Sequence, residues 1–349
     1  MRSVKLIVLF VCRALGLFRL ARAFSKRRLR ILCYHGFELL DESAFRPQLF
    51  VKPDTFERRL HALARMGFDV LPFDTAVARL QDRSLPELPL AITVDDGFYS
   101  FYVAALPRLA RHGYPATAFV TTYYVEHNHP IFRLVVQYMF WKTCERRLSL
   151  PASVAGTDMQ VDTTSAGERA AATWACIRFG EQDCNEEGRQ EICERLGSLL
   201  GVPYGPIVGS RALTLMSAAQ LRSLAAANVN VELHTHRHLF PPEDPLAGRR
   251  EVVENRAALA RILSSGTQPR HFCYPSGTWA RSQWGLLEEM NVQSAVTCMP
   301  GLNGASTPRL ALRRFLDSEQ VHLLQFEAAL SGFPDIFLPL RSSTPDHVA

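Results

Sequence analysis

Two adjacent carboxylates, Asp95 and Asp96, directly follow a run of apolar and β-branched residues from Leu88 to Val94. Such a run predicts a buried strand, and Gly97 lets the chain turn sharply after it. Sites in parallel α/β folds lie at the C-terminal ends of strands, where loops vary above a rigid sheet. Neighbouring strand residues point to opposite faces, so the two carboxylates can have different roles. The Asp-Asp-Gly sequence is equally typical of a plain turn, so this stretch alone leaves function open.

Three histidines follow a second predicted strand, Val229 to Leu233. His234 and His238 have the H-x-x-x-H spacing that brings two zinc ligands together, whereas His236, between them, is expected to point elsewhere. The alternative is a solvated histidine loop or buried histidines with a structural role. A catalytic zinc site typically takes three protein ligands, so this pair needs a third.

The two stretches, together with a later turn, resemble the polysaccharide deacetylases, the family of the NodB-homology domain. The motifs in order are T-x-D-D-G at 93–97, H-[ST]-x-x-H at 234–238 and Tyr-Pro-x-Gly at 274–277. The resemblance extends upstream to Leu-x-Tyr-His at 32–35 and covers about residues 30–122 and 213–317. Three ordered motifs are far more specific than any one of them, and the last indicates the Tyr-Pro-x-Gly subgroup.

This resemblance implies an α/β fold, the incomplete, distorted (β/α) barrel of the polysaccharide deacetylase type. It implies a metal-dependent hydrolase that removes N-acetyl groups from sugar residues of a polysaccharide or lipid-linked glycan. Asp95 would be the general base for a metal-bound water, the Ser276 N–H would stabilise the oxyanion, and Thr235 would support the histidine turn. The implied metal ligands are Asp96, His234 and His238. The implied substrate-binding residues are His35, Tyr274, Pro275 and Gly277. The two imidazoles favour Zn²⁺, although a mixed histidine and carboxylate set also suits other divalent ions.

Two departures from the family pattern concern the groups around the base. The Tyr-Pro-Ser-Gly turn lacks the arginine that begins this motif in many secreted members. Arg314 resembles the arginine of the subgroup's Leu-Pro-Arg segment and is the candidate to orient Asp95, with Arg309 and Arg313 as competitors and a surface role as the alternative. No late Leu-x-x-His motif is present, and His322 is expected to be structural, so the group that protonates the leaving amine is unassigned. Hydrolysis of another small amide, or an inactive glycan-binding protein, are the alternative functions.

The 349 residues, 47% hydrophobic and 21% charged, are typical of a globular protein. Alternating strand and helix patterns predict one domain over residues 31–340 with a helical insertion at about 123–212, a candidate for substrate selection. The last residues, 341–349, are expected to be a disordered tail.

Basic charge is concentrated at the start of the chain, where residues 1–30 carry nine Lys or Arg and no acid. Subtracting these nine from 39 leaves 30 basic against 34 acidic residues, which argues against nucleic acid as a partner. Residues 1–30 have the pattern of one basic amphipathic helix, which predicts peripheral membrane contact through residues 1–28. A signal peptide or anchor, and a helix packed on the domain, are the alternatives.

Eight cysteines without a C-x-x-C pair predict free thiols rather than a disulfide framework. They favour a cytoplasmic location, peripheral to the membrane, with export through an N-terminal signal or anchor as the alternative.

Overall fold

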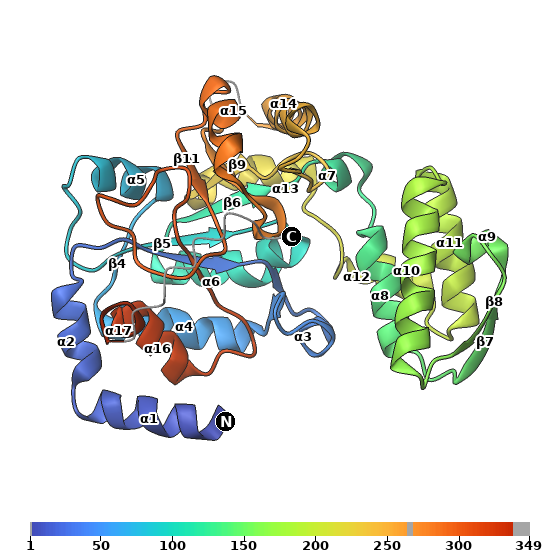
Figure 1. Ribbon diagram of the computed structural model, residues 1–349, viewed down its shortest axis with the longest axis horizontal. Helices are drawn as coiled ribbons and strands as arrows, with labels where there is room; N and C mark the ends of the chain where they lie inside the picture. The colour runs from blue at the N-terminus through green and yellow to red at the C-terminus, as the bar shows by residue number, and fades with distance from the viewer. Residues whose placement is uncertain (1, 264–267, 338–349) are drawn as a thin grey trace. The chain divides into compact units, whose positions relative to one another are not determined.

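The computed structural model describes residues 2–263 and 268–337, which fall into two compact units (Figure 1). The sheet unit comprises the described residues of 1–38, 42–126 and 216–349. The helical unit comprises residues 39–41 and 127–215. The expected tail at 341–349 lies outside the described residues.

The sheet unit is built on an open sheet of parallel strands in the order β11-β10-β9-β6-β5-β1-β12, with β4 paired to β5. The strands are β1 Arg30–Tyr34, β4 Asp69–Val70, β5 Pro89–Val94, β6 Ala116–Val120, β9 Val229–Leu233, β10 His271–Cys273, β11 Ser294–Val296 and β12 Phe315–Leu316. Two short strands, β2 Gly36–Phe37 and β3 Phe50–Val51, form a separate parallel sheet of their own. The predicted α/β fold, an incomplete barrel of parallel strands, is confirmed.

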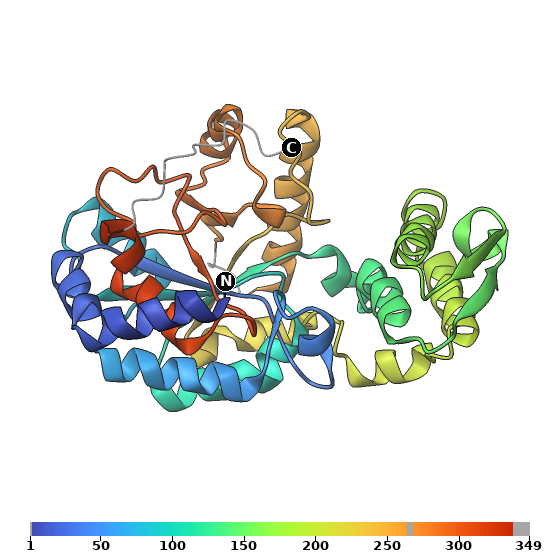
Figure 2. The same ribbon diagram turned by 60° about the horizontal axis from the view of Figure 1, so that its bottom comes forward.

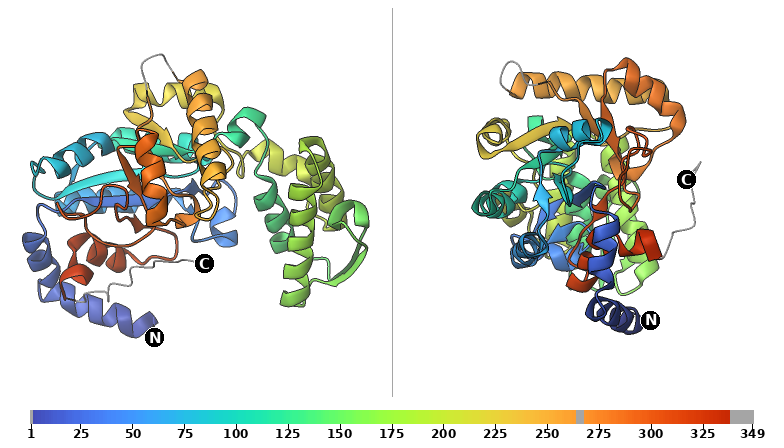
Figure 3. Two further views of the ribbon diagram at one scale, coloured as in Figure 1. Left: turned by 45° about the horizontal axis from the view of Figure 1, so that its top comes forward. Right: turned by 90° about the vertical axis from the view of Figure 1, so that its left-hand side faces the viewer.

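Helices surround this sheet (Figure 3). They are α3 Glu42–Phe45, α4 Pro53–Met66, α5 Phe73–Gln81, α6 Leu106–His112, α7 Tyr123–His127, α13 Ala218–Ser223, α14 Pro245–Ile262, α15 Trp284–Glu289, α16 Leu323–Ser331 and α17 Phe333–Phe337, with short η1 Phe101–Ala105, η2 Ala225–Ala227, η3 Pro275–Gly277 and η4 Arg281–Gln283. Every residue of β1, β5 and β6 is buried, as expected for parallel strands covered on both faces.

Three further sequence patterns in this unit predict a helix over residues 98–112, a cap at Asp54 or Thr55 for the helix that ends at Met66, and a solvated position for Glu251. The helix over 98–112 is present, but a π-helical segment, η1, lies in it before α6, and Pro107 has no N–H to continue the regular α-helical ladder there. Helix α4 begins after Lys52 with Pro53 as its first residue, so neither Asp54 nor Thr55 caps it. Glu251, expected on the solvated face of α14, is buried because it accepts hydrogen bonds from Arg237.

The N-terminal segment is two helices, α1 Arg2–Ala14 and α2 Leu17–Phe24, rather than the single helix predicted. Gly16, at φ +76°, separates the two helices. Leu9, Phe18 and Ala21 are buried against side chains of α16 and α17, and Figure 2 shows the blue α1 beside the red α16. Among the described residues, no helix is both long enough and apolar enough to cross a membrane.

The helical unit contains α8 Phe132–Lys142, α9 Ala152–Ala155, α10 Ala166–Gln182, α11 Glu186–Leu199 and α12 Tyr204–Ser210. It is not entirely helical, because β7 Arg147–Leu150 and β8 Met159–Asp162 form an antiparallel hairpin. Alternating burial along β7 is the period-2 signal of a half-buried strand, so the expected helical insertion also contains a pair of strands.

Candidate active site

Hydrogen bonds of its backbone and of its side chain fix Asp95 directly after β5. Its backbone N–H donates to the Tyr34 carbonyl at 2.9 Å, and its buried carboxylate accepts two hydrogen bonds from Arg314. The Arg314 nitrogens Nη1 and Nη2 lie 2.7 and 2.8 Å from Oδ1 and Oδ2 of Asp95. Burial alone would raise the pKa of Asp95, but the charge and hydrogen bonds of Arg314, with His35 and His234, hold it well below the usual range. The carboxylate is therefore ionised and held in one orientation.

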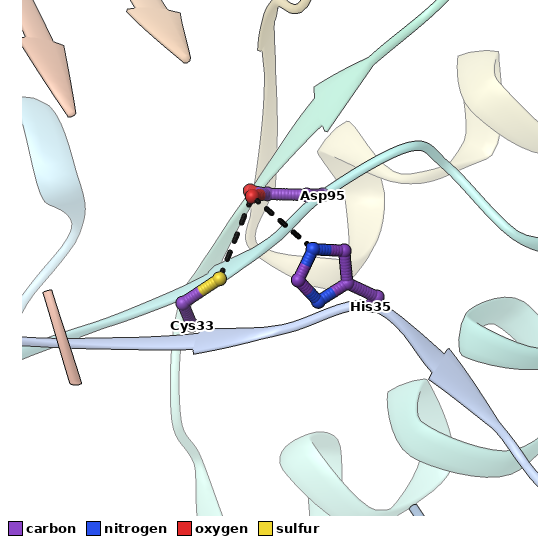
Figure 4. A group of neighbouring side chains, drawn as sticks. All are labelled: Cys33, His35 and Asp95. Atoms are coloured by element: carbon purple, nitrogen blue, oxygen red, sulfur yellow. Dashed lines mark hydrogen bonds and ion pairs between the residues drawn. The ribbon is translucent and has the colours of Figure 1, made fainter. Parts of the chain in front are cut away.

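Two buried thiols and an imidazole complete the surroundings of Asp95. Cys33 and Cys273 donate to its Oδ2 at 3.4 and 3.3 Å, from β1 and β10 respectively. The Nε2 atom of His35 lies 3.7 Å from the same oxygen, and Figure 4 shows Cys33 and His35 approaching it from one segment. Burial raises the pKa of both thiols well above the ordinary value, although Arg314 acts in the opposite direction, so they remain protonated donors.

Of the three arginines considered from the sequence, Arg314 is the one that contacts Asp95. Its side chain is fully buried, and its Nε also donates to the Thr297 carbonyl at 3.0 Å. Arg309 instead pairs with Glu288 at 2.6 Å, and Arg313 is exposed. Arg314 directly precedes β12, the strand at one edge of the sheet, which pairs with β1. This edge strand therefore positions Arg314.

Asp96, His234 and His238 form a second group next to Asp95. Oδ1 of Asp96 lies 3.3 Å from Nε2 of His234 and 3.4 Å from Nε2 of His238. One ligand atom from each of the three residues lies within 4.8 Å of the other two, so one metal ion could bind all three. His236 lies outside the group, because its Nδ1 bonds to the Thr122 hydroxyl at 2.8 Å.

The backbone of this group is strained. Asp96, Thr235 and His238 have φ values of +66°, +65° and +62°, a region that residues other than glycine adopt at a cost. The Thr235 hydroxyl, expected to support the turn, is buried and has no hydrogen-bond partner among the described residues. Strain that the surrounding structure holds in place is typical of functional sites.

Two hydrogen bonds to neighbouring residues orient His234. Its Nδ1–H donates to the Cys273 carbonyl at 2.8 Å, which leaves Nε2 free to bind a metal. Its backbone N–H donates to Oδ1 of Asn255 at 3.1 Å, while the Asn255 amide donates to the Val120 carbonyl and to the Thr122 hydroxyl, both at 3.0 Å. Asn255 thus connects the histidine turn to β6.

The two imidazoles differ in their affinity for a proton. Burial lowers the pKa of His234, but the hydrogen bond to Asp96 and the charges of Asp95 and Asp96 outweigh it, and the net shift is upward. Burial dominates at His238 and lowers its pKa to about 4 despite the charge of Asp96. Burial likewise opposes ionisation of Asp96, but the two histidines lower its pKa to about 2.

The Tyr-Pro-Ser-Gly turn lies at the end of β10. The Tyr274 side chain is buried and its hydroxyl donates to the Leu310 carbonyl at 2.9 Å, so it is a packing group rather than the expected substrate contact. Pro275 is also buried. Ser276 has a left-handed φ of +56°, and Gly277 is required, because a Cβ there would lie 2.8 Å from Cys298. The oxyanion role of Ser276 stays a prediction.

No sequence pattern indicates that Cys33, Cys273 or Asn255 belongs to this site. Cys33 lies in β1, Cys273 in β10 and Asn255 in the middle of α14. Asn255 shares the buried face of α14 with Val252 and Leu259 as well as with Glu251, and a polar residue next to apolar ones in the helical pattern is the one available signal. His322, expected to be structural, caps α16 by accepting from the Leu324 N–H.

The open parallel sheet thus carries two groups at the C-terminal ends of its strands: Asp96 with His234 and His238, and the buried Asp95–Arg314 pair. The family model described as polysaccharide deacetylase matches residues 82–146, which include Asp95 and Asp96. The predicted resemblance to this family is confirmed, while the Tyr-Pro-x-Gly subgroup stays a prediction. None of the curated proteins matches the chain.

Several solved structures share the fold. The deacetylase PplD of Streptococcus pyogenes, in complex with acetate, is 16% identical, with a TM-score of 0.58 and coverage of 87% of this chain and 98% of that one. IcaB from Ammonifex degensii is 17% identical, with a TM-score of 0.54 and coverage of 87% and 97%. A de-N-acetylase from Aggregatibacter actinomycetemcomitans is 12% identical, with a TM-score of 0.55 and coverage of 86% and 99%. At these identities the likeness shows the fold.

Proposed function

We propose that this protein is a metal-dependent hydrolase that removes N-acetyl groups from sugar residues of a glycan. The observation that carries the proposal is the group of Asp96, His234 and His238 directly beside the buried Asp95–Arg314 pair. The matching family and the similar structures are deacetylases, which supports the same reaction class.

The three side chains of this group suit a divalent cation, with Zn²⁺ as our assignment. Two imidazoles and one carboxylate are a ligand set for a catalytic metal with open positions, and His234 already has the tautomer that leaves Nε2 free. When bound there, such an ion polarises a carbonyl oxygen and lowers the pKa of water.

Asp95 is placed to accept the proton of the attacking water. Arg314 keeps it ionised at neutral pH, and the thiols of Cys33 and Cys273 fix its Oδ2. The same contacts weaken its affinity for a proton, so proton transfer to Asp95 has to accompany attack on the amide carbon rather than precede it. Arg314 acts through Asp95 as a positioning residue.

We assign the contacts to the substrate to His35 and to the backbone of Ser276. His35 is partly exposed and lies beside Asp95, so we assign it to the sugar or to the leaving amine. We assign the backbone N–H of Ser276 to the oxyanion, a type of contact worth about 3 kcal/mol to the barrier. Tyr274 and Gly277 act by shaping this turn.

The substrate we propose is a polymeric or lipid-linked N-acetylated glycan. The helical unit, residues 127–215 with 39–41, is our candidate for substrate selection. Two other functions compete: hydrolysis of another small amide, and glycan binding without catalysis. The fixed, ionised Asp95 argues against the second, because binding alone needs no base.

The test measures bound metal and acetate release from a panel of N-acetylated oligosaccharides, for the natural chain and for His234→Ala. We expect both metal and acetate to be lost in the variant and kept in His127→Ala, a control on an exposed histidine of α7 that belongs to no candidate metal group among the described residues. Metal bound by the natural chain without acetate from any sugar would contradict the hydrolase and favour glycan binding or another amide.

A further inference from the structure

Helix α1 presents large apolar side chains to solvent along one face. Val4, Ile7, Val8, Val11 and Leu15 follow the helical spacing i, i+3, i+4, i+7 and i+11, so they form a continuous stripe over α1 and the turn after it. Phe10 on α1 and Leu20 and Phe24 on α2 are exposed as well. The apolar strip, as we define it, comprises Val4, Ile7, Val8, Phe10, Val11, Leu15, Leu20 and Phe24, with exposed fractions from 45% to 72%.

The opposite side of the two helices holds this strip in its outward orientation. Leu9, Phe18 and Ala21 are buried in a cluster with side chains of α16 and α17. Nε of Arg13 lies 3.1 Å from Oε2 of Glu327, a carboxylate on α16 that is itself almost fully buried. The apolar strip therefore faces away from the sheet unit because its other side is already packed, and rotating it inward would break the ion pair.

The charge of this segment is of one sign. Residues 1–30 contain nine Lys or Arg and no acid, whereas the rest of the chain is slightly acidic. Lys5, Arg19, Arg27 and Arg28 are exposed on the same two helices and the turn that follows. An exposed apolar face with surrounding positive charge complements a lipid surface, in which acyl chains lie below anionic headgroups.

The geometry points to α1 and α2 as a docking surface for an anionic lipid bilayer, with the apolar strip at the acyl boundary and the basic side chains at the headgroups. A second copy of the chain is the competing occupant, but pairing two strips would bring two clusters of uncompensated positive charge together. The contact is interfacial, since neither helix can cross a bilayer. It involves no catalytic residue, so it stands or falls independently of acetate release.

Sedimentation of the full chain with lipid vesicles tests the apolar part. We expect binding to vesicles of phosphatidylcholine mixed with phosphatidylglycerol, and a partition coefficient lowered about tenfold or more by the double substitution Ile7→Ser and Val11→Ser. The matched control is Leu246→Ser with Val253→Ser, two exposed apolar residues of α14, which should bind as the natural chain does. Circular dichroism verifies that every variant is folded.

Charge reversal tests the basic part. We expect Lys5→Glu with Arg19→Glu to lower binding about tenfold, and Arg79→Glu with Arg222→Glu, the same change in net charge at other exposed positions, to leave most of it. Equal binding to pure phosphatidylcholine, absence of the natural chain from the pellet, or strip variants that bind unchanged would each overturn the proposal. So would self-association of the natural chain that the strip variants abolish while vesicle binding persists.

Discussion

Replacing Arg314 with methionine should leave a buried carboxylate without its counter-charge. Arg314 is fully buried and contributes both of the strongest hydrogen bonds to Asp95, at 2.7 and 2.8 Å. Breaking a buried ion pair from one side costs about 3–5 kcal/mol of stability, because the other charge remains desolvated. In the natural chain the pKa of Asp95 in the folded state lies below its unfolded value, so its contribution to stability is present above the unfolded pKa and is lost as pH falls.

In Arg314→Met, the contribution of Asp95 to the pH dependence of stability changes sign. Burial, the largest influence on Asp95, then acts against the remaining histidines alone, and the folded pKa rises. We expect stability to fall as pH rises through this higher pKa, and the acid limb of kcat/KM for acetate release to move to higher pH. Arg314→Lys keeps the charge but loses the paired geometry. It should return the acid limb of kcat/KM to its natural pH, while kcat stays about tenfold to a hundredfold below that of the natural chain.

A double-mutant cycle isolates the pair from general damage. Arg314→Met in an Asp95→Asn background should cost much less stability than in the natural chain, because no buried charge is left unpaired. Arg313→Met, an exposed neighbour, is the control and should change neither stability nor the pH profile. Additive costs in chemical denaturation, or an acid limb that stays in place in Arg314→Met, would refute this account of Asp95.

Three further variants test other parts of the site and the sheet. Asn255→Ala removes the hydrogen bonds that support the turn at His234, so it should weaken metal affinity about 10-fold to 100-fold in a metal titration. Unchanged affinity would show that the turn keeps its conformation without Asn255. His35→Gln should change kcat/KM on an N-acetylated oligosaccharide with metal content intact, and an unaltered value would exclude a substrate contact. Burial, only partly offset by backbone N–H donors, raises the pKa of Glu232 to about 8, so stability should fall as pH rises from about 4.5 to 8. Glu232→Gln should flatten that fall in urea denaturation at several pH values, whereas the same slope in both proteins would contradict the assignment.

Elements with a strong local signal could be predicted from the sequence. The apolar run of β5 and the alternation of β9 each predict a strand, and both strands end where the carboxylates and histidines begin. Bringing Asp96, His234 and His238 together needed only the strand ends and the H-x-x-x-H spacing, together with the family resemblance.

Contacts that depend on the order of strands could not be predicted in the same way. Cys33 and Cys273 lie 240 positions apart in the chain and meet at Asp95 because β1 and β10 lie on either side of the strands that carry the site. No local pattern records that neighbourhood. The break at Gly16 was different, since a glycine within a helical pattern is itself a signal, and the amphipathic spacing obscured it.

Arg314 also explains how two ionised carboxylates can stand side by side in a buried site. Neighbouring like charges raise each other's pKa, and burial adds to that effect at both Asp95 and Asp96. Arg314 offsets the charge of Asp95 from inside the sheet, which leaves the charge of Asp96 to the two imidazoles. Asp95 is paired directly with Arg314, with His35 and His234 adding to the effect, whereas Asp96 lies beside the two imidazoles of His234 and His238. Under the proposed function, Arg314 therefore lets Asp95 serve as the base while Asp96 remains available as a metal ligand.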